Sequence, residues 1–99
     1  NKGSKNLIYE LNKDGTAYTV TGYDGNKEKV TIPEVYKKLP VTAIADEAFK
    51  GNEVIKTLSI PDSVKDIGDN AFAECKVLEN LTLPKKLDSL GTSCFSSYT

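Results

Sequence analysis

Residues 59–72 read SIPDSVKDIGDNAF and hold several short structural signals within a few positions. Ile60 ends an alternating stretch, and Pro61 then stops a strand because it has no backbone N–H donor. Gly68 suits a turn or a close approach of two backbones. Pieces this short cannot each bury an apolar face, so we expect them to belong to small units that stack on one another.

The same pattern recurs along the chain at a constant interval. Phe49, Phe72 and Phe95 stand 23 positions apart. The interval also relates these sets: Ile44, Ile67 and Leu90; Ile60 and Leu83; Pro61 and Pro84. The step from Pro33 to Pro61 is 28 and predicts five extra residues around positions 36–40. A period of 23 lies within the roughly 20 to 29 residues of leucine-rich repeats, where each unit is one coil of a solenoid.

One coil can be interpreted residue by residue. Residues 57–60 alternate, which predicts a short strand with Leu58 and Ile60 directed inward. Asp69 or Asn70 is then expected to cap a single helical turn. That turn carries three inward residues, Ala71, Phe72 and Cys75. Stacked coils should place Phe49, Phe72 and Phe95 in one core column.

The first part of the chain has a different pattern. Apolar residues alternate over Leu7–Leu11 and again over Thr16–Gly22, with an Asn-Lys-Asp-Gly turn between them. This arrangement is typical of a β-hairpin. The sequence therefore predicts an α/β solenoid of short strands and single helical turns. Residues 1–29 would form an N-terminal segment with a hairpin cap, and residues 30–99 an array of about 2.5 to 3 coils.

Composition excludes several functional classes. The 13 basic residues are all Lys and face 14 acidic residues, so the chain carries a net charge of −1 and no Arg. Nucleic-acid binding is therefore not expected. The chain has no apolar run long enough to span a bilayer, so we do not expect membrane insertion.

Catalysis, cofactors and metals are not expected either. His is absent, which removes the commonest general base and metal ligand. Cys75 and Cys94 fit buried small side chains better than a disulfide or a nucleophile. Asp62, Asp66 and Asp69 do not follow the order of an EF-hand loop, so turn and helix-cap roles are the better interpretation.

The repeat resembles a known family. The stretch IPDSVKDIGDNAFAECKVLENLTLP, residues 60–84, is similar to the BspA-like class of bacterial surface-protein leucine-rich repeats. Ala45 departs from that pattern where Gly68 and Gly91 follow it, as does Asn52 where Cys75 follows it. The resemblance covers about residues 7–99. It implies a right-handed solenoid on, or secreted from, a bacterial cell that serves adhesion or protein binding without catalysis.

Two surfaces are candidate binding sites. The outward positions of three successive strands should form one polar patch made of Lys29, Thr31, Thr57, Ser59, Asn80 and Thr82. Exposed Thr and Ser are also common on sheets that bind nothing. The second candidate is the insertion with Tyr36, Lys37 and Lys38, where an exposed aromatic residue could anchor a partner. Alternatively, Tyr36 packs the hairpin onto the first coil.

The sequence thus predicts a noncatalytic module that binds a protein partner or a host surface component at the bacterial cell surface or outside the cell. A structural spacer and an accessory carbohydrate-binding region are the alternatives. The chain stops at Thr99 within a coil, which predicts either a longer array or a partner over that end. Self-association through the open C-terminal end is one form of such coverage.

Overall fold

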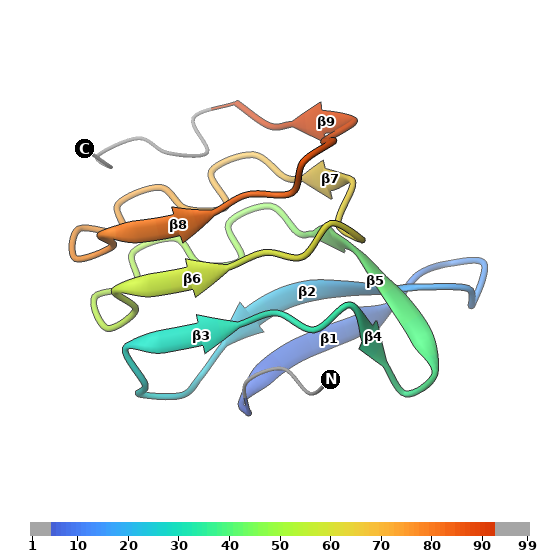
Figure 1. Cartoon of the computed structure of the whole chain (residues 1–99), viewed down its shortest axis with the longest axis horizontal. Coiled ribbons are helices and arrows are strands. Elements are labelled where there is room, and N and C mark those ends of the chain that lie inside the picture. The colour runs from blue at the N-terminus through green and yellow to red at the C-terminus, as the bar shows by residue number, and fades with distance from the viewer. Residues whose placement is uncertain (1–4, 93–99) are drawn as a thin grey trace.

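The computed structural model of the chain describes residues 5–92, and two strand walls enclose its core (Figure 1). The long sheet has the order β1 (Leu7–Leu11), β2 (Tyr18–Tyr23), β5 (Leu39–Ile44), β7 (Asp66–Ile67) and β9 (Ser89–Leu90), and β4 (Val35–Tyr36) pairs with β5. The short sheet has the order β3 (Lys29–Thr31), β6 (Thr57–Ser59) and β8 (Asn80–Thr82). Each coil therefore adds one strand to each wall.

Strand registers confirm the repeat and the solenoid. Thr57 pairs with Asn80, and Ile44 pairs with Ile67, each at an interval of 23 residues in a parallel ladder. Lys29 pairs with Thr57 across the interval of 28. The extra residues form a β-hairpin, in which β4 and β5 are antiparallel and joined at Lys37 and Lys38 with φ of 49° and 74°. Two residues with positive φ are typical of the tight turns that join hairpin strands.

The predicted N-terminal hairpin is present. Strands β1 and β2 are antiparallel, and β2 continues the long sheet by pairing in parallel with β5. The second strand begins at Tyr18, two residues later than predicted from sequence. The reason is the Asn12 side chain, whose Oδ1 accepts hydrogen bonds from the backbone N–H of Thr16 at 2.9 Å and Ala17 at 3.4 Å. These bonds keep both residues in the connecting turn.

The predicted helical turns are wrong. No helix occurs in residues 5–92, and the third side of each coil is a run of tight turns. Alternate N–H groups bond to the neighbouring coil: Phe49 N donates to Ala71 O at 2.8 Å, and Gly51 N donates to Ala73 O at 2.8 Å. A helix needs those N–H groups for its own i−4 carbonyls. Hydrogen bonds between stacked coils therefore replace intrahelical hydrogen bonds on this side of the coil.

The expected helix cap is also corrected. Asp69 Oδ1 accepts a hydrogen bond from Thr92 N at 2.7 Å, and Asp46 Oδ1 accepts one from Asp69 N at 2.7 Å. Both bonds join residues 23 positions apart and link one coil to the next. The aspartates at this position therefore hold coils together instead of capping a helix within one coil.

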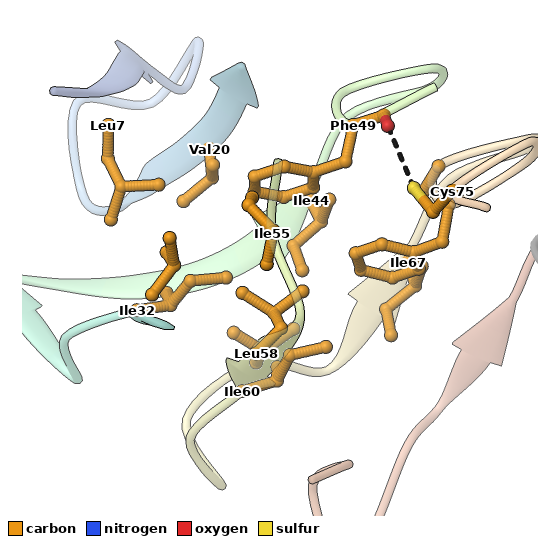
Figure 2. Close-up of a cluster of buried hydrophobic side chains, with 14 of the residues drawn as sticks. Leu7, Val20, Ile32, Ile44, Phe49, Ile55, Leu58, Ile60, Ile67 and Cys75 are labelled. Carbon is orange, nitrogen blue, oxygen red and sulfur yellow. Dashed lines mark hydrogen bonds between the residues drawn. The ribbon is translucent and has the colours of Figure 1, made fainter. Parts of the chain in front are cut away.

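The core lies between the two walls and takes most of its inward residues from the N-terminal hairpin and the first two coils (Figure 2). The Phe49 and Phe72 rings stack with centroids 5.4 Å apart and an interplanar angle of 9°, as the column predicts. Phe95 and Cys94 lie outside the described residues. The buried cluster consists of Leu7, Val20, Val30, Ile32, Val41, Ile44, Phe49, Ile55, Leu58, Ile60, Val64, Ile67, Ala71, Phe72, Cys75 and Leu78.

Candidate binding face

The outer surface of the short sheet, here called the short-sheet face, carries the six polar residues singled out from the sequence. Parallel pairing places them in two rows: Lys29, Thr57 and Asn80, and then Thr31, Ser59 and Thr82. The intervening residues of the first two strands, Val30 and Leu58, are fully buried. Because successive side chains of a strand point to opposite faces, the two rows face outward.

The two rows have a defined spacing. Neighbouring strands lie roughly 4.8 Å apart, and next-but-one residues on a strand lie roughly 6.7 Å apart. Backbone hydrogen bonds between coils also fix the residues that follow these strands: Ile32 N donates to Ser59 O at 3.0 Å, and Ile60 N donates to Thr82 O at 2.9 Å. The six side chains therefore stand on a backbone that is ordered before any ligand arrives.

The electrostatics of the short-sheet face are mild. Lys29 is its one charged member among the six, and the other five are neutral hydrogen-bonding groups. At its rim, Lys56 Nζ lies 3.6 Å from Glu28 Oε2, with both side chains largely exposed. Exposed ion pairs of this kind stabilise a fold by only about 0 to 1 kcal/mol. The face is suited to a polar ligand of low charge.

The structure supports the packing interpretation of the second candidate, Tyr36. Its ring stacks on Tyr9, with centroids 3.7 Å apart and an interplanar angle of 11°. It also meets Tyr18 edge-to-face at 5.0 Å. Lys37 Nζ lies over the Tyr36 ring, 5.4 Å from its centroid, whereas Lys38 is exposed at the turn. Tyr36 thus joins the β4–β5 hairpin to the N-terminal hairpin.

This cluster also changes the acidity of one phenol. Burial raises the pKa of the Tyr9 hydroxyl above its ordinary value, and the neighbouring Tyr36 adds a smaller electrostatic increase. The contact among the three tyrosines is not evident from the sequence alone. The signal was the presence of Tyr9 and Tyr18 on facing hairpin strands, but their meeting with Tyr36 depends on how the insertion folds back.

The remaining titratable candidates have structural surroundings. Asp62 Oδ1 accepts a hydrogen bond from Lys85 N at 2.9 Å, another contact across 23 positions. Within residues 5–92, no group of three or more Cys, Asp or Glu side chains is arranged to hold a metal ion. No helix in the same residues has the length and hydropathy to cross a membrane.

Cys75 is buried, and its thiol donates a hydrogen bond to the Phe49 carbonyl at 3.0 Å (Figure 2). Burial raises the pKa of the Cys75 thiol, while the Asn52 backbone lowers it by less. A thiol in such surroundings is a poor nucleophile. At the equivalent position of the preceding coil, Asn52 Oδ1 accepts hydrogen bonds from Val54 N at 2.8 Å and Ile55 N at 2.7 Å. Either side chain can therefore form hydrogen bonds with backbone groups at this turn of the coil.

Residues 23–99 match the family described as BspA type Leucine rich repeat region (6 copies). The chain therefore belongs to the BspA-type leucine-rich repeat family. No curated protein matches the chain.

Similar solved structures are all leucine-rich repeat proteins of bacteria. The Treponema pallidum leucine rich repeat protein is 32% identical with a TM-score of 0.90, over 95% of this chain and 44% of that chain. A leucine-rich repeat protein from Bacteroides capillosus is 31% identical with a TM-score of 0.81, over 93% of this chain and 71% of that one. A leucine rich cell surface protein from Faecalibacterium prausnitzii is 30% identical with a TM-score of 0.78, over 98% of this chain and 28% of that one. This chain thus spans less than half of the Treponema protein.

Proposed function

We propose that the chain is a noncatalytic binding module of a bacterial cell-surface or secreted protein. Its ligand would be a protein partner or a host surface component, held on the short-sheet face. The observation that carries this proposal is the in-register alignment of six outward polar side chains on three parallel strands. The likeness to a bacterial leucine rich cell surface protein supports the location.

The mechanism is recognition by a preorganised surface. Affinity is lost when a binding surface must order its side chains and loops on contact. Here the strands are already fixed by bonds between coils, such as that from Ile60 N to Thr82 O. Thr, Ser and Asn side chains both donate and accept hydrogen bonds, so the short-sheet face can match the exposed polar groups of a partner.

A carbohydrate-binding role is less well supported. Sugar recognition by stacking needs an accessible aromatic face, and Tyr36 was the candidate to supply it. The Tyr9 ring covers one face of Tyr36 at 3.7 Å, and Lys37 Nζ lies over the ring at 5.4 Å. A structural spacer remains the third hypothesis, and it predicts that no ligand binds.

The experiment measures binding of the fluorescently labelled chain to fixed epithelial cells by flow cytometry. Ser59→Arg combined with Thr82→Arg puts two large charged side chains in one row of the short-sheet face and should abolish binding. The control is Ser89→Arg combined with Thr92→Arg, which makes the same residue changes at exposed positions outside that face. Circular dichroism and thermal unfolding check that both variants fold.

The outcomes separate the three functions. Loss of binding only in the Ser59/Thr82 variant supports the proposal, whereas equal binding by both variants rules out the short-sheet face. Wild-type binding that disappears after glycosidase treatment of the cells and with Tyr36→Ala would favour sugar recognition. Absence of any wild-type binding would favour the spacer.

A further inference from the structure

Strand β1 is the edge of the long sheet, at the end of the stack opposite β9 (Figure 1). Its even-numbered residues bond toward β2. Asn12 N donates to Ala17 O at 2.9 Å, and Asn6 O accepts from Asp24 N at 3.1 Å. Neighbouring residues of a strand turn their backbone groups to opposite sides, so the odd-numbered residues of β1 direct theirs away from β2.

The outward backbone groups belong to Leu7, Tyr9 and Leu11. In residues 5–92, no strand of the long sheet lies beyond β1. The irregularity in the β1–β2 pairing leaves β1 regular, because the unpaired residue is Thr21 of β2. Strand β1 therefore presents an uninterrupted row of alternating donors and acceptors.

This edge strand lacks the Lys and Pro residues that often prevent strand addition. Natural edge strands are protected by Lys, Pro or bulges. Strand β1 has none of these and exposes two large apolar side chains, Ile8 at 45% and Leu11 at 47%. Its single charge is Glu10.

The sequence of β1, LIYEL, is complementary to itself when read antiparallel about Tyr9. In that register Tyr9 lies opposite Tyr9 of a second copy, and Leu7 lies opposite Leu11. Each of these pairs joins residues with outward backbone groups, which allows up to about six inter-chain hydrogen bonds. Ile8 lies opposite Glu10 of the second copy, so no like charges lie directly opposite each other, and the two Glu10 side chains are diagonal neighbours.

From this edge we infer that two copies of the chain pair through β1, antiparallel and with the two-fold axis at Tyr9. Two-fold interfaces need one self-complementary surface, which LIYEL supplies. The net charge of −1 opposes association little. Strand β1 belongs to the long sheet, so the short-sheet face of each copy stays free. Such a dimer would present two binding faces and raise avidity for a multivalent surface.

The test changes the charges at positions 8 and 10, which lie opposite each other in the predicted dimer. Light scattering over a dilution series measures the molar mass of each variant and so the dissociation constant of its dimer. Ile8→Glu sets a new carboxylate against Glu10 of the other copy, twice in the dimer, and should raise the dissociation constant about tenfold or more. Ile8→Lys is the matched control, because it removes the same apolar side chain but pairs with Glu10, and it should retain the dimer. Adding Glu10→Lys to Ile8→Glu should restore association.

A second readout is amide hydrogen exchange at Leu7, Tyr9 and Leu11. In the dimer these amides should be protected at high protein concentration and lose protection on dilution. A wild-type chain that stays monomeric up to about 1 mM overturns the inference. So does a dimer whose dissociation constant is equal in the Ile8→Glu and Ile8→Lys variants, since association through the β9 end would not respond to charge at position 8. A monomer that instead recruits an extended strand of another protein at β1 would also overturn it.

Discussion

At the residue scale, the stacked phenylalanines show how the repeat becomes stability. Phe72 is fully buried, and its ring stacks on Phe49 in the coil below. The two residues stand 23 positions apart, so the same place in two successive coils supplies both rings. Removing a member leaves a void that two neighbouring coils share.

Phe72→Ala is expected to reduce the free energy of unfolding by about 3 to 5 kcal/mol, because it removes the buried ring and leaves a cavity. Urea denaturation measures the change. Lys76→Ala, an exposed change in the same coil, should stay within about 0.5 kcal/mol. A small effect at Phe72 would mean that the coils collapse to fill the void.

Single residues with positive φ lie in the tight turns of successive coils. Gly51 has φ of 74°, and Glu74 takes the equivalent corner one coil later with φ of 60°. Side chains other than Gly disfavour this region by roughly 1 kcal/mol or more. No atom would contact a Cβ at Gly51, so its replacement tests the backbone alone.

We expect opposite signs at the two corners. Gly51→Ala should lower the unfolding free energy by about 1 kcal/mol, and Glu74→Gly should raise it by up to about 1 kcal/mol, less the extra freedom of Gly in the unfolded chain. Urea titrations of the two variants beside wild type measure both changes. Destabilisation of similar size in both variants would show that the Glu74 side chain, and not its backbone conformation, determines the contribution of that position to the unfolding free energy.

At the element scale, the contacts between coils depend on pairing an Asp with a Gly. A Cβ on Gly68 would meet Asp46 Oδ1 and lie 2.5 Å from Asp46 N. A Cβ on Gly91 would lie 2.5 Å from Asp69 N and 2.6 Å from Asp69 Oδ1. Ala45 stands at the equivalent place in the first coil, where the element beneath is β2 and Val20 O accepts the Ala45 N–H at 2.8 Å.

Gly68→Ala should therefore destabilise the fold by roughly 1 to 3 kcal/mol through overpacking between coils. Asp46→Asn keeps the Oδ1 acceptor for Asp69 N and should have little effect, whereas Asp46→Ala should cost about 0.5 to 1.5 kcal/mol. Thermal and urea unfolding of the three variants measure this order. An Asn variant as unstable as the Ala variant would show that the carboxylate charge matters more than the acceptor.

At the scale of the whole molecule, the tyrosine cluster joins the N-terminal hairpin to the array and makes their union sensitive to alkaline pH. The pKa of Tyr9 is raised by burial and then by Tyr36. Above the ordinary tyrosine pKa of about 10, the unfolded chain releases this proton before the folded chain does. The stability that the neutral phenol contributes is complete below that pH and is lost as the pH rises through the folded value.

Tyr9→Phe should consequently show a shallower loss of stability than wild type above about pH 10, because Phe cannot ionise. The measurement is the unfolding free energy from urea titrations at several pH values from about 8 to 11. Lysine deprotonation affects both chains alike, so the difference between the two curves isolates Tyr9. Parallel curves would contradict the assignment.

Much of this molecule could be predicted from sequence because its determinants are local and repeated. The interval between Phe49 and Phe72 predicted the solenoid, and the alternation around Ser59 predicted which side chains face outward. Those residues do line up on the short sheet. Whether they bind a partner stays a prediction.

Tertiary structure alone decided three features. The corner residues 71–75 have the spacing of a helical turn, but bonds such as Phe49 N to Ala71 O belong to the stack and no local pattern reveals them. Tyr36 met Tyr9 only because the insertion folds back as a hairpin. Strand β1 became an edge only because the long sheet ends there. A sequence period determines what each coil contains, whereas the partner of each backbone N–H depends on which coil lies next to it in space, and that contact forms only on folding.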